Sequence, residues 1–421
     1  MNDQRVIATY LVETAFSLEE AALVIAGEQS TGTFTKVPGE TDRLKEEHGA
    51  RVEGIELLEE RYQPGLPGAT VPANHDGKYR AGKITISFPL HNFGPSIPNL
   101  MSAVAGNLYE LQQLSGLRLL DLELPEAFAK RYQGPKFGID GTRKLLNVYD
   151  RPILGTIVKP SIGLTTAELG QMVERLALAG LDFIKDDELN ANPTYAPLEE
   201  KVRVVMEAIE RAADKTGKKL MYAFNITGDW DELRKHHDIV KNAGGNCVMV
   251  SVLSVGLPGM AYLNDYSELP IHAHRNQWGM LTRSPHLGIE FTAYQKLCRL
   301  AGADHIHVNG LNGKFYESNA SVVSAIQACT TPLYAGYETM PVISNGQWAG
   351  TAHPTYEATK TLDVMHLAGG GMLAHPDGAA AGFESMRLAW EAAASGESFS
   401  DCANKNPVVQ RAIEKFGKVG H

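Results

Sequence analysis

Eight short apolar segments alternate with stretches of helical spacing between residue 141 and the C-terminus of this 421-residue chain. The apolar segments are Ile153–Val158, Leu181–Ile184, Lys219–Asn225, Cys247–Val252, Leu269–His274, Asp304–Val308, Pro341–Ser344 and Val364–Ala368. Amphipathic stretches between them include Thr166–Leu178, Leu198–Lys215, Trp230–Asn242, Phe291–Leu300 and Ser318–Cys329, and a last one follows Gly378. Eight strand–helix repeats predict a (β/α)8 TIM barrel. A doubly wound open sheet is the alternative, but no glycine-rich dinucleotide turn follows the first strand.

Residues 1–140 show a different pattern, which predicts an α+β (ferredoxin-like) domain. Strand-like segments are expected at Val6–Val12, Lys83–Leu90 and Leu117–Leu124, with helices at Leu18–Ala26 and Ile97–Leu108. Gly134–Gly138 then marks a boundary. We therefore expect an α/β protein, with an N-terminal α+β domain at 1–140 and a C-terminal barrel at 141–421.

Composition excludes several classes of partner. The formal net charge is −10 and no basic block occurs, which argues against nucleic-acid binding but not against a small anionic substrate. The four cysteines share no metal-ligand spacing. No apolar stretch reaches membrane-spanning length, and the N-terminus lacks a signal-peptide core. We expect a soluble cytoplasmic protein without a membrane or nucleic-acid partner.

The second predicted strand ends in an unusual group of charged residues, Lys185-Asp186-Asp187-Glu188. Asp187 and Glu188 supply hard oxygen ligands of the kind that Mg²⁺ prefers. An ammonium cannot bind a cation, so Lys185 would become a ligand only after CO2 converts its amine to a carbamate. The alternative interpretation is a solvated salt-bridge cluster at the end of a strand.

Chemically active side chains also follow other predicted strands, and the carboxyl ends of barrel strands form the active site in this fold. The first strand ends at Lys159-Pro160-Ser161 and the third near Asn225, whereas the fourth offers no recognisable group. The remaining candidates are His272, His274 and Arg275, then His305, His307 and Lys314, then Ser344–Gly346, and finally Gly369–Gly371.

These groups suit chemistry on a phosphorylated substrate. Glycine-bearing turns after the last two strands expose backbone N–H groups where barrels often bind phosphate, although Gly369–Gly371 alone could be a tight turn. Arg275 and His307 offer a second anion contact. The metal would act as a Lewis acid for an enediolate, and either Lys159 or the carbamate would move the proton.

The sequence resembles the large subunit of ribulose-1,5-bisphosphate carboxylase/oxygenase (RuBisCO), and more closely the RuBisCO-like proteins. The resemblance covers nearly the whole chain, and its motifs are Gly155–Pro160, Asp182–Glu188, His272–Arg275, Asp304–His307 and Gly369–Gly371, with Glu28, Thr33 and Asn107 in N-terminal motifs.

The resemblance implies a role for each of these residues. Lys185 would be carbamylated by CO2 and would hold Mg²⁺ with Asp187 and Glu188. Lys159 matches the proton-abstracting lysine and Lys314 the loop lysine that meets a carboxyl group, while His272 and His307 are further catalytic candidates. Substrate-anion contacts match Arg275, His307, Ser344, Gly346, Gly369 and Gly370. The N-terminal domain would complete the partner's active site in a homodimer, or in a multiple of dimers, through Glu28, Thr33 and Asn107.

Departures from the family pattern bear on the activity. Ser161 replaces a second lysine of true carboxylases, Trp278 replaces a histidine and Asn345 a glycine, which argues against carboxylation of ribulose bisphosphate. Methionine-salvage enolases of the RuBisCO-like group have a lysine at the position of Asn107 and lack the lysine corresponding to Lys314.

This pattern is similar to the branch that acts on 3-oxo-isoapionate 4-phosphate as a transcarboxylase/hydrolase. Such an enzyme would release the carboxylate to leave a metal-stabilised enediolate, recapture CO2 at the neighbouring carbon and hydrolyse the carbon–carbon bond, giving 3-phosphoglycerate and glycolate. The alternatives are an enolase or isomerase of a (methylthio)ketose phosphate, a ribulose-bisphosphate carboxylase, or a non-catalytic regulatory protein.

Overall fold

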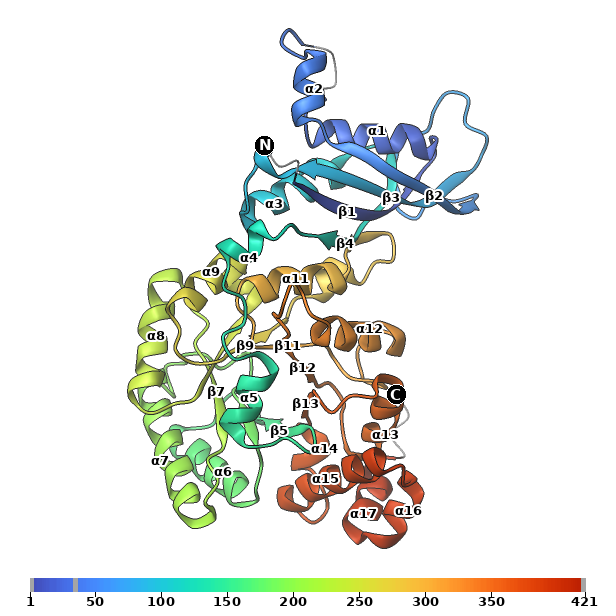
Figure 1. The fold of residues 1–421 in the computed structure, drawn as a ribbon. Coiled ribbons are helices and arrows are strands. Elements are labelled where there is room, and N and C mark those ends of the chain that lie inside the picture. The colour runs from blue at the N-terminus through green and yellow to red at the C-terminus, as the bar shows by residue number, and fades with distance from the viewer. Residues whose placement is uncertain (1–3, 33–36, 418–421) are drawn as a thin grey trace. The chain divides into compact units, whose positions relative to one another are not determined.

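The computed structural model describes residues 4–32 and 37–417. The chain forms two compact units (Figure 1). The first comprises the described residues up to Gln133 together with Gln277–Leu300, and the second comprises Gly134–Asn276 and the chain from Ala301 onward. The domain ranges 1–140 and 141–421 remain predictions.

The first unit is built on a five-stranded mixed sheet in the order β10-β4-β1-β3-β2. The strands are β1 (Arg5–Thr14), β2 (Arg51–Arg61), β3 (Tyr79–Pro89), β4 (Leu114–Glu123) and β10 (Leu287–Ile289). Its helices are α1 (Leu18–Glu28), α2 (Asp42–His48), α3 (Ile97–Val104), α4 (Ala127–Arg131), α10 (Gly279–Thr282) and α11 (Phe291–Leu300). A capping box between Ser17 and Glu20 starts α1, whose apolar side is buried. The predicted α+β class is confirmed.

Two strands of this sheet, β2 and β10, were not predicted from the sequence. β2 is almost entirely exposed, so it lacks the alternation of buried and exposed residues that identifies a strand. β10 has three residues and comes from a distant part of the chain, where it pairs in parallel with Leu117–Leu119 of β4. The predicted helix Ile97–Leu108 ends at Val104, and a 3-10 turn follows at Asn107–Glu110 after Gly106.

The second unit contains a closed barrel of eight parallel strands, as predicted. In chain order the strands are β5 (Ile153–Ile157), β6 (Phe183–Lys185), β7 (Met221–Asn225), β8 (Cys247–Ser251), β9 (Ile271–His274), β11 (His305–His307), β12 (Met340–Ile343) and β13 (Met365–Leu367). Buried side chains from these strands, including Phe183, Met249 and Met365, form a single apolar cluster. The barrel interior is therefore a packed core that fixes the positions of the strand ends.

Among the helices of this unit, those that begin at Thr166, Leu198, Trp230, Asn319 and Ala379 match predicted stretches, and the others were not predicted from the sequence. They are α5 (Gly138–Leu146), α6 (Thr166–Leu178), α7 (Leu198–Thr216), α8 (Trp230–Asn242), α9 (Val252–Tyr266), α12 (Asn319–Thr330), α13 (Ala352–Thr359), α14 (Gly370–Leu373), α15 (Ala379–Ser395), α16 (Phe399–Lys405) and α17 (Pro407–Phe416). α9 is kinked because Gly256 adopts a φ of 73° two residues before Pro258. Within the described residues, no helix has the length and apolar character needed to cross a membrane.

Candidate active site

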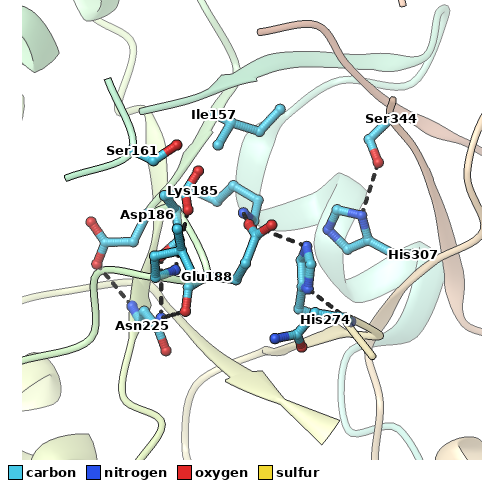
Figure 2. Close-up of polar contacts among 12 residues, drawn as sticks. Ile157, Ser161, Lys185, Asp186, Glu188, Asn225, His274, His307 and Ser344 are labelled. Atoms are coloured by element: carbon cyan, nitrogen blue, oxygen red, sulfur yellow. Dashed lines mark hydrogen bonds and ion pairs between the residues drawn. The ribbon is translucent and has the colours of Figure 1, made fainter. Parts of the chain in front are cut away.

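Lys185 ends β6 with a side chain that is completely buried (Figure 2). Its Nζ atom lies 3.4 Å from Oε2 of Glu188. Burial lowers the pKa of Lys185, although the charges of Glu188, Asp187 and Asp186 act in the opposite direction. A lowered pKa enlarges the fraction of neutral amine, which is the form that reacts with CO2.

Two carboxylates directly follow this lysine. Asp187 Oδ2 accepts a hydrogen bond from Lys159 Nζ at 2.7 Å. Glu188 Oε2 lies 3.5 Å from His274 Nε2. Burial tends to raise the pKa of Glu188, but the charges of His274 and Lys185 prevail and lower it to about 2. Glu188 is therefore an anion at neutral pH and suits a hard cation.

Asp186, between Lys185 and Asp187, has a different function. Its buried carboxylate accepts hydrogen bonds from Lys201 Nζ at 2.7 Å, Tyr222 Oη at 2.6 Å and the backbone N–H of Asn225 at 2.9 Å. Because these three donors occupy both of its oxygens, Asp186 holds β6 to its neighbours. Lys201 could not be identified from the sequence, since a lysine on the buried side of α7 resembles any helical lysine until its partner is known.

Asn225, at the end of β7, supports the two carboxylate residues through their backbone. Its Nδ2 group donates to the carbonyl oxygens of Asp187 and Glu188, each at 3.2 Å (Figure 2). Asn225 is completely buried. The third strand end therefore orients the site without contributing a reactive group.

Four histidines come from β9 and β11 themselves. His272 Nε2 and His307 Nε2 are 2.9 Å apart, and His272 Nδ1 and His305 Nδ1 are 3.3 Å apart. His307 Nδ1 also lies 3.0 Å from Ser344 Oγ. Burial lowers the pKa of His272 and His307 far below its ordinary value, and lowers that of His305 to about 3. Burial similarly lowers the pKa of His274 to about 4. All four imidazoles are neutral at pH 7.

Arg275 follows β9 and forms a buried ion pair that the sequence analysis did not foresee. Its Nη2 atom lies 2.6 Å from Oε2 of Glu317, and Nη1 lies 3.4 Å from Oε1. Asn309 donates a further hydrogen bond to Glu317. The expected anion-binding arginine therefore already has a carboxylate partner within its own chain.

A second group of candidate site residues lies where β5 and β13 end. Lys159 Nζ donates to Ser161 Oγ at 2.8 Å, and 44% of the Lys159 side chain is exposed. A Cβ atom added to Gly369 would lie 3.8 Å from Cε of Lys159, and one added to Gly370 would meet nothing within 4 Å. The glycine turn is thus open and adjacent to the lysine. The first N–H groups of α14, which starts at Gly370, have no acceptor within the helix.

The turn after β12 explains one departure from the family pattern. Asn345 and Gly346 have φ values of 78° and 70°, a conformation natural for glycine and tolerated by asparagine. Asn345 also contacts the loop that carries Lys314, because a Cβ atom on Gly313 would approach Asn345 Nδ2 to 2.7 Å. Asparagine is therefore compatible with the positive φ at this position.

Lys314 is exposed, with Nζ 5.5 Å from the centroid of the Phe315 ring. Across residues 4–32 and 37–417, it forms no hydrogen bond or ion pair with Lys159, Lys185, Asp187 or Glu188. Lys314 must therefore move if it is to reach the charged group at β6.

Two of the N-terminal candidates meet within the first unit. Asn107 Nδ2 donates to Glu28 Oε1 at 3.4 Å, and both side chains are exposed. Glu28 also lines a concave region of about 690 Å³ with Ser30 and Thr31. Thr33 lies outside the described residues. Trp278 belongs to the same unit, where it is buried against Phe291 and Tyr294.

The donor atoms fit a magnesium site on one condition. Across the described part of the chain, no three His, Cys, Asp or Glu side chains are grouped so that they could hold a metal ion. Asp187 and Glu188 provide two carboxylates, and a carbamate on Lys185 would provide the third anionic ligand. The site therefore suits Mg²⁺ once Lys185 has reacted with CO2.

Two family models together cover most of the sequence. Residues 138–416 match the catalytic domain of the ribulose bisphosphate carboxylase large chain, and residues 1–128 match its N-terminal domain. The chain belongs to the RuBisCO large-chain family. Within that family it is a RuBisCO-like protein, as the following similarities show.

Two of the similar proteins are named for the same substrate. A 3-oxo-isoapionate-4-phosphate transcarboxylase/hydrolase from Xanthobacter autotrophicus is 50% identical, over 97% of this chain and 99% of the relative. A 3-oxo-isoapionate-4-phosphate decarboxylase from Rhizobium etli is 44% identical, over 97% of this chain and 98% of the relative.

A solved RuBisCO-like protein from Burkholderia fungorum has a TM-score of 0.91 and 43% identity, over 97% of this chain and 99% of that chain. The octameric RuBisCO of Pyrococcus horikoshii has a TM-score of 0.86 and 30% identity, over 99% of this chain and 96% of that chain. This RuBisCO-like chain therefore shares the family's two-part architecture.

Proposed function

We propose that this RuBisCO-like enzyme converts 3-oxo-isoapionate 4-phosphate to 3-phosphoglycerate and glycolate as a transcarboxylase/hydrolase. The observation that carries the proposal is the completely buried Lys185 amine, 3.4 Å from the Glu188 carboxylate and adjacent in sequence to Asp187. The substrate is inferred from the relative that is 50% identical and bears this activity in its name.

Lys185, as its CO2 adduct, would hold Mg²⁺ together with Asp187 and Glu188. When bound, Mg²⁺ supplies Lewis-acid stabilisation of negative charge that develops on substrate oxygens. His274 lies 3.5 Å from Glu188 and burial keeps it neutral, so its imidazole is able to accept a proton. Lys159 donates to Asp187 and faces solvent, which places a proton donor at the rim of the site.

The substrate phosphate would bind beside Lys159, on the open turn of Gly369 and Gly370. The proposed contacts for the opposite end of the substrate remain Ser344, Gly346, His307 and Arg275. His272 forms a hydrogen bond with His307. Lys314 would approach the substrate carboxylate by movement of its loop.

Assembly is proposed on family grounds. Solved relatives include an octameric and a dimeric RuBisCO. A homodimer, or a multiple of dimers, would allow Glu28, Thr33 and Asn107 of one subunit to complete the barrel site of another. The exposed Asn107–Glu28 hydrogen bond supports this role, because it leaves both polar groups accessible. We place the enzyme in the cytoplasm.

Relatives of 44% and 42% identity are named 3-oxo-isoapionate-4-phosphate decarboxylases, and this activity is the second candidate. The deciding experiment incubates purified protein with Mg²⁺, bicarbonate and 3-oxo-isoapionate 4-phosphate and identifies the products by NMR. We expect 3-phosphoglycerate and glycolate in equal amounts, and none with Lys185→Ala. Release of CO2 with a shortened ketose phosphate would assign the decarboxylase activity, and turnover of a methylthio-sugar phosphate instead would assign an isomerase.

A further inference from the structure

The ion pair between Arg275 and Glu317 is almost completely shielded from water. The two side chains are 5% and 6% exposed, and two nitrogen–oxygen contacts of 2.6 and 3.4 Å join them. Burial lowers the pKa of Arg275, although the Glu317 carboxylate acts in the opposite direction. A guanidinium held by a carboxylate in this way is a strong, directional pair.

This pairing neutralises the positive charge of Arg275 at the end of β9. His307, whose pKa burial lowers, is neutral at pH 7. A phosphate dianion that approached Arg275 would also approach the Glu317 carboxylate. Like charges at short range repel, and a poorly solvated site strengthens the repulsion.

The region where β5 and β13 end differs in exposure, although Lys159 also has a carboxylate partner, since its Nζ atom lies 2.7 Å from Asp187 Oδ2. The Lys159 side chain is 44% exposed, compared with 5% for Arg275, and lies beside the open turn of Gly369 and Gly370. The two strand ends therefore differ in how accessible their cation is to a phosphate.

We propose that Glu317 is a specificity-determining residue, which restricts the enzyme to substrates with one phosphate group by neutralising Arg275. The inference rests on the proposed function and deepens it, because the substrate named for the 50% identical relative carries a single phosphate. The single phosphate of the substrate binds beside Lys159, where β5 and β13 end.

Glu317 also has a structural contact, since Asn309 donates to it from the start of the same loop. The substitution Glu317→Gln separates the two roles. Glutamine keeps the size of the side chain and an oxygen that accepts from Arg275 and Asn309, but it removes the negative charge. A purely structural role therefore predicts little change in ligand preference.

The test measures binding of ribulose 5-phosphate and ribulose 1,5-bisphosphate to the full-length protein by calorimetry, with Mg²⁺ and bicarbonate present. Wild type should bind the two ligands with affinities within about threefold, because Glu317 already neutralises the arginine that a second phosphate would meet. Glu317→Gln should bind the bisphosphate roughly 10- to 100-fold more tightly, and the monophosphate as before, as expected when one charged hydrogen-bonding partner becomes available.

A double variant shows whether the gain operates through the arginine. In Arg275→Met/Glu317→Gln the improved bisphosphate binding should disappear. Glu357→Gln, which removes an exposed carboxylate on α13, is the charge control and should resemble wild type.

Three outcomes would overturn the inference: a gain in Glu317→Gln that persists in the double variant, no gain, or no bisphosphate binding by Glu317→Gln. If Glu317→Gln does not fold, the affinities of the wild-type protein for the two ligands test the proposal. A more than tenfold preference of wild type for the bisphosphate contradicts it. Since the readout is binding, failure to turn over 3-oxo-isoapionate 4-phosphate would count against the proposed function and not against this inference.

Discussion

The Nε2 atoms of His272 and His307 lie 2.9 Å apart, so one of these nitrogens carries a hydrogen and the other accepts it. The three histidines His305, His272 and His307 form a row of hydrogen bonds. Its direction follows from the contact between His305 and Thr142. Thr142 donates its hydroxyl hydrogen to the carbonyl oxygen of Gly138, and must therefore accept from His305 Nε2 at 2.8 Å. Neutral His305 then accepts at Nδ1 from His272 Nδ1, and His272 accepts at Nε2 from His307. The Ser344 hydroxyl consequently donates to His307 Nδ1.

Histidine tautomers give the first prediction. ¹⁵N NMR of the wild-type protein should show Nε2–H tautomers at His305 and His307 and the Nδ1–H tautomer at His272. Thr142→Val removes the acceptor that fixes this order, so His305 and His307 should become mixtures of tautomers. An Nδ1–H tautomer at His307 in the wild type would contradict the assigned direction of this row of hydrogen bonds.

Acid stability gives a second prediction. Burial lowers the pKa of His366 to about 3, compared with about 6.5 in an unfolded chain. Between these values the unfolded state binds the additional proton, so the free energy of unfolding falls as the pH falls from about 6.5 towards 3, by up to about 1.4 kcal/mol per pH unit for this residue. His366→Gln should reduce the slope of urea-unfolding stability against pH by that amount between about pH 4 and 6. An unchanged slope would show that His366 is protonated in the folded protein.

Asn225 should control metal affinity without binding metal. Asn225→Ala removes the hydrogen bonds to the carbonyl oxygens of Asp187 and Glu188, so both carboxylates lose their fixed direction. We expect Mn²⁺ affinity, measured by electron paramagnetic resonance with bicarbonate present, to fall roughly 10- to 100-fold. Asn246→Ala is the matched control, because Asn246 bonds to the backbone of Leu220 and Tyr222 at the start of β7. Equal losses in the two variants would point to general destabilisation.

Lys314 should be needed for carboxylate handling more than for proton exchange. Lys314→Met is expected to lower product formation from 3-oxo-isoapionate 4-phosphate by roughly 10²–10³-fold, as for loss of one transition-state donor. Solvent deuterium uptake next to the substrate carbonyl should survive much better, because Lys159 and the Lys185 group remain. Mass spectrometry and NMR on the same variant give both rates. If both fall equally, Lys314 is a general binding residue.

Sharing of active sites between subunits is testable by complementation. Asn107→Ala and Lys185→Ala should each be inactive alone, and co-expression should restore activity. A mixed dimer then has one site with both lesions and one site with neither. Mixed dimers that form but show no activity would place Asn107 in its own subunit's site or outside any site.

The barrel could be predicted from sequence because buried parallel strands are short apolar segments flanked by periodic helices. Lys185, Asp187 and Glu188 were also identifiable, since a lysine among carboxylates at a strand end is unusual. Glu317, Lys201 and Thr142 were not, because their importance depends on partners that are 42, 15 and 163 residues away. Sequence patterns report the periodicity of one segment, whereas these contacts depend on which strand ends become neighbours.

The short strand β10 has a consequence for biosynthesis. It covers the edge of β4, and Arg118 of β4 donates to the carbonyl oxygens of Thr282 and Leu287, while Tyr109 donates to that of Gly288. Until the ribosome has synthesised this segment, the β4 edge is unpaired and Arg118 lacks these acceptors. A nascent chain that ends before residue 287 thus exposes a strand edge that is prone to intermolecular pairing. The N-terminal unit must wait for most of the barrel to be translated before it is complete.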